Sequence, residues 1–187
     1  GSLNTFAKPT NVDTNSRIIC YDIRDLGKQL LPVGMLVVLD SVFNRVIRNR
    51  VLGRNTWIYI DEIYLLFQHE YSANFLFTLW KRVRKYGACA TGLTQNVDDL
   101  LQSHTARTML ANSEFLVMLN QAATDRAELA RLLNISDNQL SYITNVDFGH
   151  GLLKCGSTIV PFADNFPQHT RLFKLMTTRP KDITGNL

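Results

Sequence analysis

The chain has 187 residues, of which 45% are hydrophobic and 19% charged, and this composition suits one soluble globular domain. A formal net charge of +4 permits an acidic partner such as nucleic acid or a membrane surface without requiring one. The three cysteines, Cys20, Cys89 and Cys155, are too far apart for a disulfide framework or zinc site, and the first two lie in apolar runs that predict reduced core residues. No uninterrupted apolar run approaches about 18 residues, so no membrane span is expected.

The polar, irregular start of the chain predicts a flexible lead-in over residues 1–15. Gly1-Ser2 without an initiator Met resembles the remnant of a cleaved tag, so we expect a fragment of a longer protein. One folded domain is expected over residues 16–180, followed by a loose tail over 181–187.

Hydrophobic spacing and turn residues predict an alternation of strands and helices. Strands are expected over 17–22, 57–61, 88–95 and 115–119, with a hairpin over 151–162. Helices are expected over 28–50, 72–86, 97–101, 106–111, 124–133 with Thr124 as N-cap, a short stretch from Ser136, and 170–176. This order predicts an α/β fold with a mainly parallel sheet flanked by helices and a C-terminal β-hairpin.

The apolar run of residues 57–60 ends in two acids, Asp61 and Glu62. This is the pattern of a Walker B motif, in which a buried parallel strand carries acids to the ligand-binding edge of an open sheet. There Asp61 would hold Mg²⁺ through water, and Glu62 would polarise the water that attacks the γ-phosphate. The alternative is a buried strand that happens to end in solvated acids.

The phosphate-binding half of such a site is missing from the sequence. A P-loop requires Gly, four residues, and then Gly-Lys-Ser/Thr. The one Gly-Lys pair, Gly27-Lys28, is followed by Gln29 and has Asp22 where the first glycine belongs. The chain therefore looks like part of a nucleotide-hydrolysing motor without its phosphate-binding loop.

A second polar group, Thr94-Gln95-Asn96, closes the next predicted strand. Its side chains should emerge at the same sheet edge as Asp61 and Glu62, where Gln95 would hydrogen-bond the γ-phosphate or its water and sense hydrolysis. An amide that merely caps a loop is the alternative.

Two arginines are candidates for an arginine finger that a neighbouring subunit supplies to the transition state, and Arg126 is preferred over Arg107. Each could equally be a surface arginine paired to Glu114 or Glu128. The basic cluster of residues 81–85 could contact DNA phosphates or acidic lipid, although a solvated helix face is the simpler interpretation. The four histidines lack metal-ligand spacing.

Several runs in order resemble the conjugation and type IV secretion ATPases of the CagE/TrbE/VirB kind, in the form found on conjugative elements of Gram-positive bacteria. These runs are residues 17–26, 57–67, 79–82, 92–97, 109–115 and 133–136, and the resemblance covers residues 16–180. It implies a partial RecA-like P-loop NTPase core of the FtsK/HerA kind that works as a hexamer or as other oligomers at the cytoplasmic face of the cell membrane. The terminal residues 149–162 resemble the closing hairpin of that family.

The resemblance implies ATP and Mg²⁺ as cofactors, Asp61 and Glu62 as the Walker B acids, Gln95 as the sensing glutamine, and Arg126 or Arg107 as the finger. It also implies other secretion or conjugation proteins as partners, peripheral association with a membrane complex, and possible contact with DNA. From the resemblance we predict that the longer parent hydrolyses ATP. Because the Walker A motif is missing, we predict that this chain alone does not. A non-catalytic docking module and a DNA-translocating motor remain as alternative functions.

Overall fold

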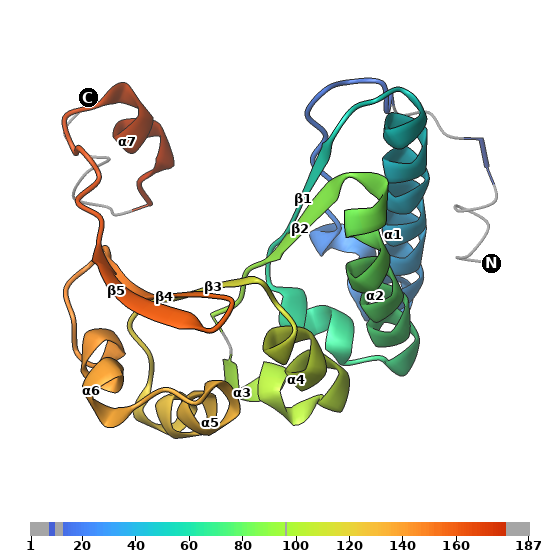
Figure 1. Cartoon of the computed structure of the whole chain (residues 1–187). Coiled ribbons are helices and arrows are strands. Elements are labelled where there is room, and N and C mark those ends of the chain that lie inside the picture. The colour runs from blue at the N-terminus through green and yellow to red at the C-terminus, as the bar shows by residue number, and fades with distance from the viewer. Residues whose placement is uncertain (1–7, 10–12, 96, 179–187) are drawn as a thin grey trace. The chain divides into compact units, whose positions relative to one another are not determined.

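The structure, a computed structural model, describes residues 8–9, 13–95 and 97–178. Strands and helices are mixed, and a parallel strand pair is flanked by helices, as the sequence predicts (Figure 1). The chain separates into two compact units, Gly1–Met109 and Leu110–Leu187. Each unit has a sheet of its own, with strands β1 and β2 in the first and β3, β4 and β5 in the second.

The first unit contains a crossover in which helix α2 joins two parallel strands. Strand β1 (Thr56–Ile60) pairs with β2 (Ala88–Gly92), in a register that runs from Thr56 opposite Ala88 to Ile60 opposite Gly92. Between them lie the 3-10 helix η3 (Ile63–Phe67), α2 (Glu70–Val83) and the 3-10 helix η4 (Arg84–Tyr86). Because parallel strands run in the same direction, their carboxyl ends meet at one edge of the sheet.

The long helix α1 (Gly27–Val51) precedes β1 and packs on α2. The core of this unit lies between the helices and the strands, and consists of Val46, Ile58, Leu79, Val83 and Ala88. Burial of side chains of this size stabilises a fold by about 1.5–3 kcal/mol for each of the larger ones. The sequence prediction of helices over 28–50 and 72–86 is confirmed to within a few residues.

Residues 29–51 of α1 are long and apolar enough, by length and composition, to cross a membrane. Polar residues interrupt this stretch, so it contains no continuous apolar run of about 18 residues, and the expectation of no membrane span stays a prediction. Core helices of soluble proteins meet the same measure, and α1 supplies Met35, Leu39 and Val46 to the buried set.

The segment before α1 does not form the strand expected over residues 17–22, and it pairs with no strand among the described residues. It lies instead along α1, where the Arg45 guanidinium donates to the carbonyl oxygens of Thr14 and Ser16. The Tyr21 hydroxyl lies 3.1 Å from that of Ser41. A short 3-10 helix, η2 (Arg24–Leu26), leads into α1.

The cysteines are exposed, so the expectation that Cys20 and Cys89 are core residues is wrong. Cys20 lies in the segment that forms no strand. Cys89 lies opposite Trp57 in the sheet, on the face that the described helices leave open, where Trp57 is 66% exposed. Alternation along a strand sends Ala88 to the covered face and Cys89 to the other.

The second unit is built on an antiparallel sheet. Strand β3 (Phe115–Met118) pairs with β4 (His150–Cys155), which pairs with β5 (Thr158–Ala163) through a tight turn at Gly156 and Ser157. The Gly156 amide also donates to the Glu114 carbonyl at 3.0 Å and closes the ladder. The predicted terminal hairpin is therefore confirmed, and the strand expected over 115–119 pairs with its first strand.

Short helices complete the chain, namely α3 (Val97–Gln102) and α4 (His104–Ala111) before β3, then α5 (Ala123–Leu133), α6 (Asp137–Leu140), the 3-10 helix η5 (Ser141–Ile143) and α7 (Arg171–Met176). Ser136 caps α6 in a reciprocal capping box with Gln139, and the Thr170 hydroxyl accepts from the Phe173 amide at the start of α7. The expected Thr124 cap is wrong, because α5 begins one residue earlier and its N-cap is Ala122, which makes no side-chain cap.

Candidate active site

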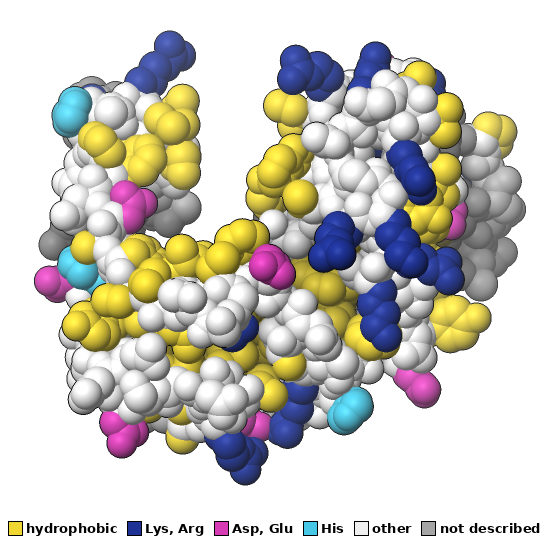
Figure 2. All heavy atoms as spheres, in the orientation of Figure 1, with side chains coloured by type: hydrophobic (Ala, Val, Ile, Leu, Met, Phe, Trp, Pro, Cys, Tyr) yellow, Lys and Arg dark blue, Asp and Glu magenta, His cyan; other side chains and the backbone are white. Residues whose placement is uncertain are grey.

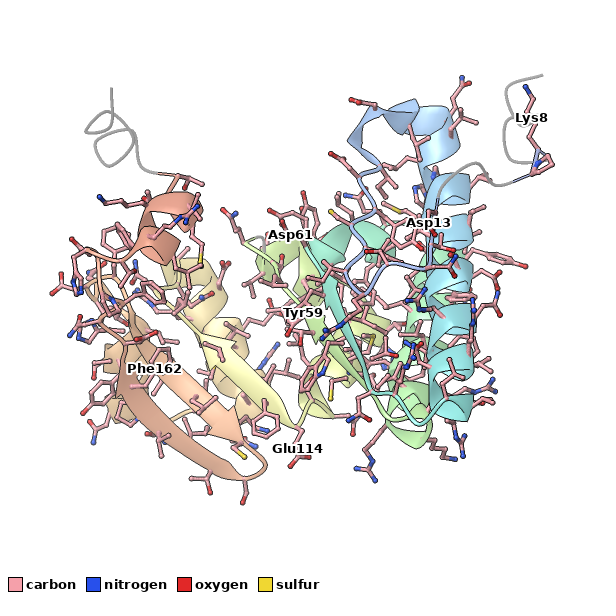
Figure 3. The ribbon with its side chains drawn as sticks, turned by 90° about the horizontal axis from the view of Figure 1, so that it is seen from above. Lys8, Asp13, Tyr59, Asp61, Glu114 and Phe162 are labelled. Carbon is pink, nitrogen blue, oxygen red and sulfur yellow. The ribbon has the colours of Figure 1, made fainter. Side chains whose placement is uncertain are left out.

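Asp61 and Glu62 form the turn that follows β1, at the carboxyl edge of the parallel sheet (Figure 3). The Asp61 side chain is exposed, and its Oδ1 accepts a hydrogen bond of 3.0 Å from the Glu62 amide. This bond holds the sharp turn after the strand and engages one of the two carboxylate oxygens of Asp61. An exposed carboxylate at a sheet edge is the kind of group that holds Mg²⁺ through water.

Glu62 has a left-handed backbone, with φ 48° and ψ 48°, and so departs from the conformation that a glutamate prefers. Such a conformation costs a non-glycine residue about 1 kcal/mol or more. Its Oε2 atom is buried and finds no hydrogen-bond partner within the described residues. Since buried polar atoms are almost always paired, an unpaired carboxylate oxygen on a strained residue indicates a group held ready for a ligand or water.

The loop after β2 is tied to this turn by the main chain of Leu93. The Leu93 amide donates to the Ile60 carbonyl at 2.8 Å, and the Leu93 carbonyl accepts from the Ile63 amide at 2.9 Å. Gly92 permits this close approach, because a Cβ at that position would lie 2.5 Å from Cδ1 of Ile63. The two strand ends are thereby held together directly beneath the acids.

Gln95 follows two residues after Leu93, and its side chain is exposed. The structure therefore brings Asp61, Glu62 and Gln95 to the same edge of one unit, as the sequence predicts for parallel strands. Thr94 is half-buried beside them, and Asn96 lies outside the described residues. The chemical roles of these side chains remain predictions.

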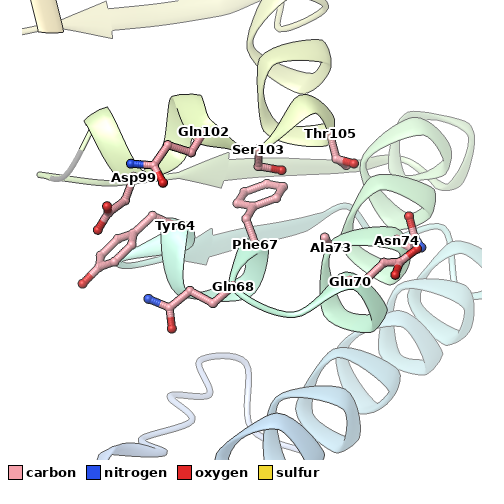
Figure 4. Close-up of a pocket in the computed structure, with 10 residues that line it drawn as sticks. All are labelled: Tyr64, Phe67, Gln68, Glu70, Ala73, Asn74, Asp99, Gln102, Ser103 and Thr105. Atoms are coloured by element: carbon pink, nitrogen blue, oxygen red, sulfur yellow. The ribbon is translucent and has the colours of Figure 1, made fainter.

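A pocket of about 580 Å³ lies beside this turn and was not predicted from the sequence (Figure 4). It is formed by η3, α2 and the helices after β2, and its lining residues include Tyr64, Phe67, Glu70, Asp99 and Gln102. The residues that line it include no Lys or Arg, so the pocket does not suit a phosphate group.

The structure places the two candidate finger arginines in different units. Arg107 lies half-buried in α4 of the first unit, where its Nε donates to the carbonyl oxygen of Leu101 at the end of α3. Arg126 lies half-buried in the first turn of α5, in the second unit. The preference for Arg126 as the finger stays a prediction.

The acids and the amide fit one half of a nucleotide site. Two carboxylates and a glutamine at the carboxyl edge provide oxygen donors for Mg²⁺ and a partner for water. The other half, a glycine-rich loop of main-chain amides with a lysine, does not occur in these 187 residues. Among the described residues, no three His, Cys, Asp or Glu side chains come together as a metal cluster of their own.

A parallel α/β unit with a strand-Asp-Glu end and a neighbouring strand-Thr-Gln end is the arrangement expected at the ligand-binding edge of a P-loop nucleotide-hydrolase domain. A family model agrees with this class. The model of the TraG P-loop domain matches residues 7–151, so the chain belongs to that family.

A solved structure is also similar. The chain resembles the structure of VirB4 of Thermoanaerobacter pseudethanolicus with a TM-score of 0.76 and 26% sequence identity. The similarity covers 86% of this chain and 45% of the VirB4 chain, so this chain spans less than half of that protein. A comparison with curated proteins gives no match. The resemblance to conjugation and type IV secretion ATPases that the sequence indicates is confirmed.

Proposed function

We propose that this chain is the acid-bearing part of an ATP-hydrolysing motor that serves conjugative DNA transfer or type IV secretion. Membership of the TraG P-loop family and the similarity to VirB4 support this proposal. The observation that carries it is Glu62, a left-handed residue whose carboxylate oxygen is buried and unpaired within the described residues. A purely structural turn at this position would favour Asn or Gly, which adopt the left-handed conformation at lower cost.

When bound, Mg²⁺ and ATP supply the transferable phosphoryl group and neutralise its charge. Asp61 would then hold the cation through water with its exposed carboxylate. Glu62 would orient the attacking water and accept its proton at Oε2, the atom that the fold leaves unpaired. Gln95, after the neighbouring strand, would hydrogen-bond the γ-phosphate or the attacking water. The main-chain bonds of Leu93 would hold the two strand ends that carry these three side chains together.

The test is ATP hydrolysis by a longer protein that joins this chain to a phosphate-binding loop, with and without Glu62→Gln. We expect the substitution to reduce turnover by about 10²–10⁴-fold, because a positioned general base typically contributes that much, while ATP binding is retained. Glu70→Gln is the matched control, because Glu70 is an exposed acid of the same unit at the start of α2. It should leave turnover unchanged.

Two results would contradict the proposal. Turnover that survives Glu62→Gln would show that another group is the catalytic base. An absence of turnover in the intact protein would favour the docking-module alternative, in which the acids do no chemistry. The 187-residue chain alone should not hydrolyse ATP, because it lacks the amide cradle and lysine that bind the phosphates.

The proposed setting of the motor follows from the family. We propose a homo-oligomer, a hexamer in the intact protein, in which Arg126 or Arg107 reaches a neighbouring site. It would lie in the cytoplasm at the inner face of the cell membrane, beside other secretion or conjugation proteins. A duplex DNA partner belongs to the alternative of a DNA-translocating motor, and salt-dependent DNA binding would support that alternative.

A further inference from the structure

One end of the first unit is basic and free of acids. Residues 41–60 and 71–97 contain no Asp or Glu, and their charged residues are Arg45, Arg48, Arg50, Arg54, Lys81, Arg82, Arg84 and Lys85. Arg45 holds the segment before α1, so it is set apart. The other seven are exposed, and we define them together as the basic pole. Figure 2 shows Lys and Arg side chains gathered over the part of the molecule that α1 and α2 form.

Packing brings the members of the basic pole together from separate parts of the sequence. The Arg50 guanidinium lies over the ring of Tyr86, 5.0 Å from its centroid, which places the end of α1 against η4. Phe43 meets the same ring edge-on, with centroids 5.6 Å apart. The Thr56 amide donates to the Gly87 carbonyl at 3.3 Å, which joins the start of β1 to the loop after η4. The pole therefore lies at the amino edge of the sheet, and the acids lie at the carboxyl edge.

An exposed apolar pair lies between two of these cations in the chain. Val51 is 82% exposed and Leu52 is 53% exposed, at the end of α1 between Arg50 and Arg54. Cations in the last turn of a helix are expected from the helix dipole, and this accounts for part of the charge. The dipole does not account for Arg54, which lies beyond the end of α1, or for an exposed apolar pair.

We propose that the basic pole, with Val51 and Leu52, is a docking surface for an anionic lipid bilayer. Charge complementarity supports this partner, because each Lys or Arg near an anionic membrane strengthens binding about fivefold. Exposed aliphatic side chains flanked by cations are typical of segments that lie in the membrane interface, where the side chains enter the headgroup region. The phosphates of a nucleic acid would bind the same cations but would offer no apolar region in which Val51 and Leu52 could be buried. A bilayer therefore matches this surface better than a nucleic acid does.

The experiment is sedimentation of the whole chain with vesicles of phosphatidylcholine, with and without phosphatidylglycerol. We expect binding to the mixed vesicles alone, and a steep fall in binding as salt is raised. Neutralising Arg54, Arg82, Arg84 and Lys85 to Gln should weaken this binding by about a hundredfold or more. Arg50 and Lys81 are kept, since their cations pack on Tyr86 and Phe77.

Two matched controls distinguish binding through the basic pole from effects of total charge and of exposed apolar surface. The first neutralises four exposed cations elsewhere, namely Arg17, Arg131, Arg171 and Lys174, and should leave binding within about threefold of the unchanged chain. The second compares two double variants. One carries Val51→Ser and Leu52→Ser, and the other carries Leu175→Ser and Leu172→Ser, two leucines outside the basic pole that are 73% and 54% exposed. Only the first pair should weaken binding, by about tenfold or more. Circular dichroism confirms that each variant is folded.

Three outcomes would overturn the proposal. The first is no binding to the anionic vesicles by the unchanged chain. The second is equal losses from the pole variant and its control, which would indicate a general charge effect. The third is duplex DNA binding that the pole variant abolishes and the Val51/Leu52 variant leaves intact, together with weak vesicle binding. That result would assign the cations to nucleic acid. None of these readouts depends on ATP hydrolysis, so the proposal and the motor function fail separately.

Discussion

The two units use opposite kinds of strand pairing. In the first, β1 and β2 are parallel and are joined across α2, so that both strands end at the same edge. In the second, β4 and β5 are antiparallel and joined by the turn at Gly156, so that neighbouring strands end at opposite edges. Parallel pairing gathers the residues that follow successive strands, and antiparallel pairing separates them.

This difference explains where the candidate site lies. The pair Asp61 and Glu62 is far from Gln95 in sequence, and all three reach the same edge because their strands run in the same direction. The second unit has the larger sheet, in which a third strand pairs with the hairpin. Because its neighbouring strands are antiparallel, their carboxyl ends lie at opposite edges of the sheet. The smaller sheet is therefore the one that carries the candidate site.

The largest expected effects come from removing a core leucine in each unit. Leu79 is 2% exposed in the core between α1, α2 and the parallel strands, and Leu152 is fully buried in β4. Leu79→Ala and Leu152→Ala should each destabilise the protein by about 2–5 kcal/mol, because they remove the same side chain and leave a cavity. Amide hydrogen exchange should lose protection mainly in the unit that carries the substitution. Equal loss of protection in both units from either change would show that they unfold as one.

A second comparison uses one glycine from each sheet. A Cβ at Gly151 would lie 2.3 Å from the main-chain oxygen of Met118, whereas a Cβ at Gly92 would meet the end of the Ile63 side chain at 2.5 Å. A side chain can rotate away, but a paired strand cannot move without breaking its ladder. Gly151→Ala should therefore cost about 2–3 kcal/mol and Gly92→Ala about 1 kcal/mol in urea unfolding. The reverse order would mean that the parallel pair is the more rigid sheet.

The smallest expected effects concern two helix starts in the second unit. Ser136→Ala removes a reciprocal capping box and should cost about 1 kcal/mol. Ala122→Asn would supply a cap where α5 has none, and Ala122 already has the extended backbone that a cap requires, so a gain of about 0.5–1 kcal/mol is expected. Thermal unfolding measures both, and a loss of stability with Ala122→Asn would contradict the capping argument.

Much of the fold could be predicted because its signals are local. The long apolar spacing of α1, the strand before Asp61 and the hairpin at Gly156 are each visible within a few residues. The strand expected over 17–22 was wrong because a strand depends on a partner elsewhere in the chain, and Arg45 holds this segment on α1 instead. The exposure of Cys89 likewise depends on which face of the sheet the helices cover.

The candidate site shows the same limit. Its three side chains could be predicted because each follows a recognisable strand, and parallel pairing does the rest. The left-handed backbone of Glu62 could not, since glutamate has no local preference for it. The pocket at Tyr64 and Phe67 also depends on the packing of η3, α2 and α3, which no single segment specifies. The choice between Arg107 and Arg126 depends on a neighbouring subunit.

The Leu93 peptide has a practical consequence for redesigning this edge. Its amide and carbonyl bind Ile60 and Ile63, so a one-residue slip of the loop that carries Gln95 would break both bonds at once. These main-chain bonds therefore limit how far the start of that loop can move from the acids. Substitutions at Gln95 leave them in place, whereas a change at Asp61 also removes the hydrogen bond to the Glu62 amide, so position 95 is the better place to install and compare alternative hydrolytic groups.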